Sequence, residues 1–137
     1  MDIRAKIIIV DDNLMFRQVI KHLVEIEEIG EVIAEAENGQ VFLDLLEKFT
    51  PDLVLMDIEM PVMGGLEATV KALAIKPDLK ILVLTLLMDK NNFDNLKNAG
   101  ALGFVLKTCG KKELEKAIKS VIAGESNFPN RLSYSKA

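Results

Sequence analysis

Several residue types and patterns are scarce in this 137-residue sequence. Cys109 is the only cysteine, which excludes an internal disulfide and a zinc site built on several cysteines. Its apolar stretches are far shorter than the roughly 20 residues of a membrane-spanning helix, and its first residues lack the apolar centre of a secretory signal. We therefore expect a cytoplasmic protein that has no membrane partner.

The sequence also lacks a large excess of charge of either sign. The sequence has 17 Lys and Arg residues against 21 Asp and Glu residues, a formal net charge of −4. This balance gives no electrostatic reason to bind nucleic acid or an anionic membrane. No glycine-rich phosphate loop is present, so nucleotide binding has no support. With 50% hydrophobic and 28% charged residues, the chain is typical of one globular domain.

The hydrophobic pattern predicts alternating strands and helices. Four short runs rich in Val, Ile and Leu indicate strands buried on both faces, and a fifth run is weaker. The strong runs are 6–10, 52–56, 80–84 and 102–106, and the weaker one is 31–36. Apolar residues at helical spacing predict helices over 13–28, 38–48, 66–75, 91–98 and 111–123. This order favours an α/β fold with a doubly wound parallel sheet.

Polar side chains follow four of the five predicted strands. Asp11 and Asp12 follow the first, Asp57 the third, Thr85 the fourth and Lys107 the fifth. Ligands of open α/β sheets bind beyond the carboxyl ends of the strands, so we expect these side chains to converge there.

The residue types at this edge point to phosphoryl transfer. Clustered carboxylates repel one another unless a cation lies between them, and oxygen ligands without His or Cys favour Mg²⁺. Lys107 is a point charge suited to a phosphate oxygen. Positive charges of this kind stabilise the transferred oxygens in phosphoryl transfer, and an aspartate can itself accept the phosphoryl group.

Together with Met60-Pro61 and Gly64-Gly65, these positions resemble the receiver domain of two-component response regulators. The resemblance covers roughly residues 5–124. It implies a flavodoxin-like (βα)5 fold, with five parallel strands in the order 2-1-3-4-5. It also implies a receiver (phosphoacceptor) domain at 1–124, followed by a C-terminal tail or truncated linker at 125–137.

The resemblance assigns roles to individual residues. Asp57 is expected to accept a phosphoryl group from a sensor histidine kinase. Asp12 is expected to bind Mg²⁺ directly and Asp11 through water, with Asp57 and the backbone carbonyl of Glu59 completing the protein's ligands. Lys107 is expected to pair with Asp57 or with its phosphoryl group.

The resemblance also implies a conformational switch. Thr85 is expected to move and donate a hydrogen bond to the phosphoryl group, and Phe104 is expected to swing inward behind it. The chain would then be a phosphoacceptor that assists its own phosphorylation and dephosphorylation, and not an enzyme. The switch is expected to rearrange a face that can form a homodimer.

Two short motifs resemble one branch of the family. Ala99-Gly100-Ala101 and Ala123-Gly124-Glu125 are similar to segments of LuxR/NarL-type transcription factors. The resemblance implies that the output is transcription, through a C-terminal DNA-binding domain that is absent from this chain. The alternative is a stand-alone module that acts through protein contacts.

Other interpretations of the same residues are open at this stage. Leu86 stands where the family usually has a small residue, and it could block Asp57 and leave a phosphorylation-independent interaction module. The run Asp11-Asp12-Asn13 could cap the first helix. A Mg²⁺-dependent phosphohydrolase would need Asp-x-Asp after the first strand, and this run departs from that pattern.

Overall fold

The computed structural model describes residues 4–129, which form five strands and five helices in strict alternation. The elements are β1 (Ala5–Val10), α1 (Leu14–Ile26), β2 (Gly30–Ala36), α2 (Gly39–Leu45), β3 (Leu53–Asp57), α3 (Gly65–Ile75), β4 (Ile81–Thr85), α4 (Lys90–Ala99), β5 (Gly103–Leu106) and α5 (Lys111–Ile122). All ten predicted elements are present, so the prediction from periodicity is confirmed.

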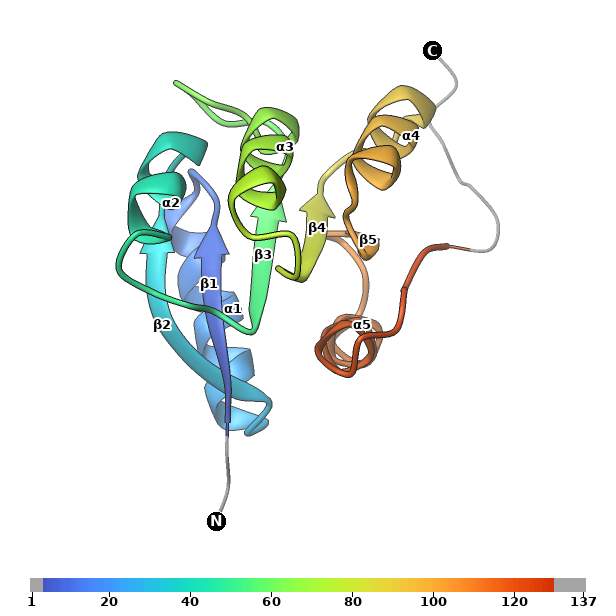
Figure 1. The fold of residues 1–137 in the computed structure, drawn as a ribbon. Helices are drawn as coiled ribbons and strands as arrows, with labels where there is room; N and C mark the ends of the chain where they lie inside the picture. The colour runs from blue at the N-terminus through green and yellow to red at the C-terminus, as the bar shows by residue number, and fades with distance from the viewer. Residues whose placement is uncertain (1–3, 130–137) are drawn as a thin grey trace.

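The five strands form one parallel sheet in the order β2-β1-β3-β4-β5. This order confirms the predicted flavodoxin-like arrangement. Helices α2, α3 and α4 lie on one face of the sheet, and α1 and α5 lie on the other (Figure 1). The carboxyl ends of β1, β3, β4 and β5 therefore meet at one edge.

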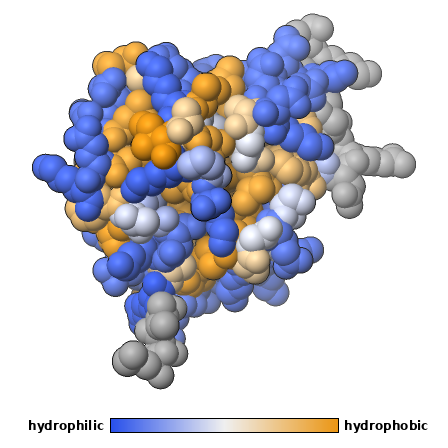
Figure 2. Space-filling model, viewed as in Figure 1, coloured by the Kyte–Doolittle hydropathy of each residue, from blue (hydrophilic) through white to orange (hydrophobic). Residues whose placement is uncertain are grey.

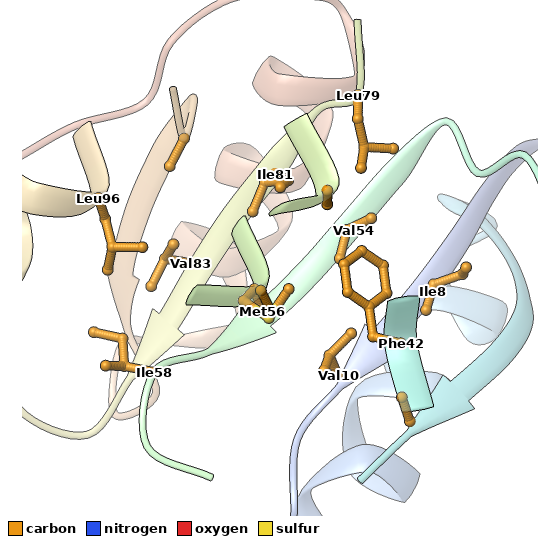
Figure 3. Close-up of a cluster of buried hydrophobic side chains, with 14 of the residues drawn as sticks. Ile8, Val10, Phe42, Val54, Met56, Ile58, Leu79, Ile81, Val83 and Leu96 are labelled. Carbon is orange, nitrogen blue, oxygen red and sulfur yellow. The ribbon is translucent and has the colours of Figure 1, made fainter. Parts of the chain in front are cut away.

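Each face of the sheet has its own apolar core. Figure 3 shows the cluster beneath α2, α3 and α4, in which alternate residues of the central strands meet Phe42 and Leu96. The strand residues of this cluster include Ile8, Val10, Val54, Met56, Ile81 and Val83. The residues between them pack against α1 and α5 on the other face. Burial on both faces explains why these strands read as continuous apolar runs.

Polar side chains define where several helices begin. The side chains of Asn13, Asn38 and Asp89 accept hydrogen bonds from backbone amides in the first turns of α1, α2 and α4. Helix α2 ends at Leu45, three residues before its predicted end. Past that point the amides of Glu47 and Lys48 donate to carbonyls three residues back, so the chain tightens into turns.

The segment after α5 packs against the sheet as far as it is described. Asn127 forms an isolated parallel bridge with Gly103 of β5. The predicted tail at 125–137 therefore begins with residues that contact the domain, and its remainder, 130–137, lies outside the described residues. The domain boundary at residue 124 stays a prediction.

The surface viewed in Figure 2 carries hydrophobic residues interspersed with hydrophilic ones. Exposed apolar side chains on α3 include Val70 and Ile75. Single exposed apolar residues are common on globular proteins and do not by themselves define a binding face. Within residues 4–129, no helix is both long enough and apolar enough to cross a membrane.

Candidate functional site

Asp11, Asp12 and Asn13 occupy the turn between β1 and α1, and each has a different environment. Asp11 is 2% exposed, and its Oδ1 accepts a hydrogen bond from the Asn13 amide at 2.9 Å. Asp12 is exposed. Asn13 caps α1 by accepting from the Phe16 amide at 2.9 Å. The capping interpretation is therefore confirmed for Asn13, while both aspartates are left at the edge of the sheet.

Asp57 is the last residue of β3 and is 7% exposed. Its Oδ1 accepts a hydrogen bond from the Ile58 amide at 2.8 Å. Carboxylate oxygens of Asp11, Asp12 and Asp57 all lie within 4.8 Å of one another. The expected convergence of the three acids is confirmed, and their spacing allows one cation to contact all three.

Lys107 follows β5 and brings a positive charge to these acids. Its Nζ lies 2.6 Å from Asp11 Oδ2 and 3.4 Å from Asp57 Oδ2. The Lys107 amide donates to the Thr85 carbonyl at 2.7 Å, which fixes the lysine at the end of the sheet. Its Nζ also lies 4.5 Å from the centre of the Phe16 ring, within range of a cation–π contact. The ammonium is thus held between two buried carboxylates.

The closest approach of Lys107 is to Asp11. The contact at 2.6 Å is an ion pair, and no hydrogen bond to Asp11 Oδ2 is found among residues 4–129. A buried oxygen without a donor is costly unless a cation or water satisfies it. The Lys107 ammonium is that cation here and is shared with Asp57, so this oxygen by itself does not require a metal ion.

The electrostatic environment of Asp57 opposes its ionisation. Burial raises the pKa of Asp57 from 3.8 to about 6, and the Asp11 charge adds to this effect. The Lys107 charge and the Ile58 amide lower the pKa but do not cancel the rise. Two acids therefore share one lysine, and the site is short of positive charge.

Thr85 and Glu59 line the same cavity as Asp57. This cavity has a volume of about 300 Å³, and Asp12 and Lys107 also line it. Thr85 is the last residue of β4, and its hydroxyl donates to the Leu87 carbonyl at 2.9 Å. In this structure the Thr85 hydroxyl therefore donates its hydrogen bond to the loop that follows β4.

Phe104 lies apart from the cavity. It is on β5, is 1% exposed and packs against Phe93 of α4, with ring centroids 5.3 Å apart. Its side chain already occupies an inward position, in the core between β5 and α4.

Two residues of the cavity were missed from the sequence. Asp89 and Asn92 line it from the start of α4, and the Asn92 side-chain amide donates to Asp89 Oδ2 at 2.8 Å. A capping residue ahead of an amphipathic helix is the signal for Asp89, but no pattern shows that this helix begins beside the acids. Leu86 and Leu87 complete this side, and Leu86 is 64% exposed.

The loop after β3 approaches Asp57 closely. The Gly65 amide donates to the Ile58 carbonyl at 2.7 Å, and a Cβ at position 65 would overlap the Asp57 carbonyl. Glycine at this position lets α3 begin against the end of β3. This explains the glycine in the motif that the sequence showed.

The order of the sheet and the acidic cavity at its carboxyl edge first define a class, the CheY-like, flavodoxin-like α/β proteins. The sequence model of the response regulator receiver domain matches residues 7–119. The chain belongs to this family.

Curated relatives include transcriptional regulators. The chain is 37% identical over 121 residues to "Transcriptional regulatory protein DegU" of Brevibacillus brevis, and 39% identical over 120 residues to "Response regulator GacA" of Pseudomonas aeruginosa. Each match covers 88% of this chain, but 51% and 56% of the respective relative. The chain thus spans about half the length of these relatives.

Solved structures agree with this assignment. A two-component response regulator of the LuxR family from Aurantimonas sp. has a TM-score of 0.86 and 32% identity, covering 91% of this chain and 89% of its own. A DNA-binding response regulator of the LuxR family from Staphylococcus aureus has a TM-score of 0.81 and 29% identity, covering 86% and 98%. The expected resemblance to LuxR-type receivers is confirmed.

Proposed function

We propose that this domain accepts a phosphoryl group on Asp57 from the phosphohistidine of a sensor histidine kinase. The observation that carries the proposal is the position of Lys107 Nζ, 2.6 Å from Asp11 and 3.4 Å from Asp57 at the edge of the sheet. An ammonium held there can attract a phosphoryl oxygen as it approaches Asp57. The adjoining cavity of about 300 Å³ gives the phosphoryl group a place to enter.

The residues present fit a Mg²⁺ ion. Asp11, Asp12 and Asp57 bring carboxylate oxygens within 4.8 Å of one another, and the Lys107 ammonium is shared between two of them. Mg²⁺ prefers oxygen ligands and usually keeps several waters. We assign its protein ligands to these three aspartates and the backbone carbonyl of Glu59. When bound, the ion supplies the positive charge that the site lacks.

In the transfer, a carboxylate oxygen of Asp57 attacks the phosphorus and forms an O–P bond. The N–P bond of the phosphohistidine breaks, and its electron pair stays on the ring nitrogen, which takes a proton. With a pKa of about 6, Asp57 is mostly ionised at neutral pH and can act as the nucleophile. Lys107 stabilises the charge on the transferred oxygens by position and charge alone. The domain thus assists its own phosphorylation and dephosphorylation without being a classical enzyme.

The switch that we propose starts at Thr85. A phosphoryl group on Asp57 adds about −1.5 to −2 charge and three acceptor oxygens to the cavity. The Thr85 hydroxyl can then exchange the Leu87 carbonyl for a phosphoryl oxygen. Since Phe104 is already buried, its part in the switch is to hold the inward position behind Thr85.

The output that we propose is control of transcription. Several relatives carry the words "transcriptional regulatory protein" or "DNA-binding response regulator" in their names. This chain aligns with about half the length of the curated relatives. DNA would be contacted by a domain that is not part of residues 1–137, and a homodimer of the receiver would bring two such domains together. The single free cysteine fits a reducing cytoplasm, where we place the reaction.

The test is direct phosphorylation by a small donor. We expect the protein to gain one phosphoryl group, measured by intact mass, when it is incubated with acetyl phosphate and Mg²⁺. Asp57→Asn should abolish the gain. Asp89→Asn is the matched control, because Asp89 faces the same cavity but caps α4, a role that Asn also fills. Full incorporation in Asp57→Asn, or none in the wild type, would contradict the proposal.

The same experiment separates the alternatives. A domain that Leu86 blocks would take up no phosphoryl group, whereas a phosphohydrolase would turn over a small phosphate ester without retaining one. The open cavity beside Asp57 favours uptake.

A further inference from the structure

Residues 125–129, which we name the C-terminal strap, run along the free edge of β5. The Asn127 amide donates to the Leu102 carbonyl at 2.8 Å, and the Phe104 amide donates to the Asn127 carbonyl at 3.0 Å. A Cβ at Gly103 would lie 2.6 Å from Leu82 Cδ1 and 3.2 Å from the Asn127 oxygen, so glycine relieves crowding chiefly against Leu82 and to a smaller extent against the strap. The strap therefore extends the sheet beyond β5 by a single bridge.

An aromatic side chain fastens the strap to α4. The ring of Phe128 lies edge-on to Phe93, with centroids 5.7 Å apart and an interplanar angle of 76°. Lys97 Nζ lies 5.1 Å from the centre of the Phe128 ring. Phe93 also packs on Phe104, so the three phenylalanine rings join the strap, α4 and β5 in one cluster.

The strap is lightly packed apart from these contacts. A cavity of about 480 Å³ separates it from α5, and Met88, Phe104, Lys116 and Phe128 are among its lining residues. The Glu125 amide adds a third backbone hydrogen bond, to the Ser120 carbonyl of α5 at 2.9 Å, and three such bonds with one aromatic side chain are a small set of contacts. Segments held this way open at low free-energy cost compared with core strands.

The Thr85 loop connects the strap to the phosphorylation site. Thr85 donates to the Leu87 carbonyl, and the next residue, Met88, lines the cavity beneath the strap. Asp89 then caps α4, the helix that carries Phe93 one turn later. The Thr85–Leu87 hydrogen bond therefore links the phosphorylation site to the loop that leads to both Met88 and the start of α4.

We propose that the strap is docked when Asp57 is unmodified and is released when Asp57 is phosphorylated. This inference rests on the proposed function. Breaking the Thr85–Leu87 hydrogen bond frees the 86–89 loop and displaces Phe93, which removes the packing surface of Phe128. The position of the strap thus depends on whether Asp57 is phosphorylated.

Amide hydrogen exchange measures docking directly. We expect the amides of Phe104 and Asn127 to exchange faster when Mg²⁺ and beryllofluoride, a phosphoryl analogue, are added. The Val54 amide is the control, since it donates to the Lys80 carbonyl inside the sheet and should keep its exchange rate. Unchanged or slower exchange at Phe104 and Asn127 with beryllofluoride bound would overturn the inference.

Thermodynamic reciprocity gives a second test. If analogue binding releases the strap, weakening the strap must tighten analogue binding by the same coupling. We expect Phe128→Ala to bind beryllofluoride and Mg²⁺ roughly 5-fold more tightly in calorimetry, at the low end of coupling between sites. Ser126→Ala in the same segment, which removes no aromatic contact, is the matched control and should bind as the wild type does.

The two proposals fail in different ways. A wild-type protein that binds no beryllofluoride at millimolar Mg²⁺ would overturn the proposed function. Equal analogue affinity in Phe128→Ala and the wild type would overturn the strap inference alone.

Discussion

The two sides of the Asp57 cavity are built differently. One side, which we call the acid wall, consists of Asp11, Asp57 and Lys107 at the ends of strands. The other, the switch wall, consists of Thr85, the 86–89 loop and the start of α4. The acid wall follows strands whose residues are almost completely buried. The switch wall is exposed at Leu86 and is held by the side-chain hydrogen bonds of Thr85 and Asp89.

The difference separates chemistry from response. Packed strands hold charges at fixed positions, and phosphoryl transfer depends mainly on positioning and charge. A loop with few contacts can instead adopt a second arrangement at small cost. Changes in the acid wall should therefore act on phosphorylation itself, whereas changes in the switch wall should act on access and on the response.

The largest effect is expected at Lys107. Lys107→Ala removes the cation that faces Asp57, and we expect phosphorylation by acetyl phosphate to slow by about 100-fold at saturating Mg²⁺. Lys111→Ala is the control, because Lys111 pairs with Glu27 on the surface and not with the acids. Equal rates in the two variants would show that the acid wall does not act through this charge.

The titration of Asp57 is expected to have the next largest effect, on the stability of the fold. In metal-free protein the pKa of Asp57 is raised from 3.8 to about 6, so between these pH values the folded chain binds a proton that the unfolded chain has lost. The free energy of unfolding of the wild type should therefore fall as pH rises from 4 to 7, relative to Asp57→Asn. The relative change is about 2 kcal/mol.

Urea unfolding of both proteins in a metal chelator measures this difference. The Asp57→Asn variant lacks the titrating group, so effects of the other carboxylates cancel in the comparison. If the free energy of unfolding changed with pH in the same way in both proteins, the raised pKa of Asp57 would be contradicted. Added Mg²⁺ should reduce the difference at pH 7.

The smallest effect is expected on the switch wall at Leu86. Leu86→Ala enlarges the mouth of the cavity without touching the acids, and we expect phosphorylation to be a few-fold faster. Val70→Ala, a comparable truncation of an exposed residue on α3, should leave the rate unchanged. A slower rate in Leu86→Ala would mean that this side chain assists the donor and does not shield Asp57.

The sequence predicts most of the acid wall because each of its acids can be located from the residues next to it in the chain. Each acid directly follows an apolar run, and parallel strands bring those ends together. The sequence does not predict that Lys107 lies closer to Asp11 than to Asp57, since this depends on side-chain packing around Phe16.

The switch wall and the strap are harder to predict for a physical reason. The strap is held by backbone groups of Glu125 and Asn127, which any residue can supply, and by one ring, Phe128, in a polar segment. Such a segment has no strand or helix periodicity, so it was expected to be a tail. Likewise, the sequence predicts that the Thr85 side chain lies in the site, but it does not predict the hydrogen bond from the Thr85 hydroxyl to the Leu87 carbonyl.

The structure of this protein bound to Mg²⁺ and beryllofluoride tests the central claim most directly. We predict an ion in contact with oxygens of Asp12 and Asp57, the analogue attached to the Asp57 carboxylate, and Lys107 Nζ within hydrogen-bond distance of a fluorine. An analogue bound elsewhere, or a Lys107 side chain turned away from it, would contradict the account.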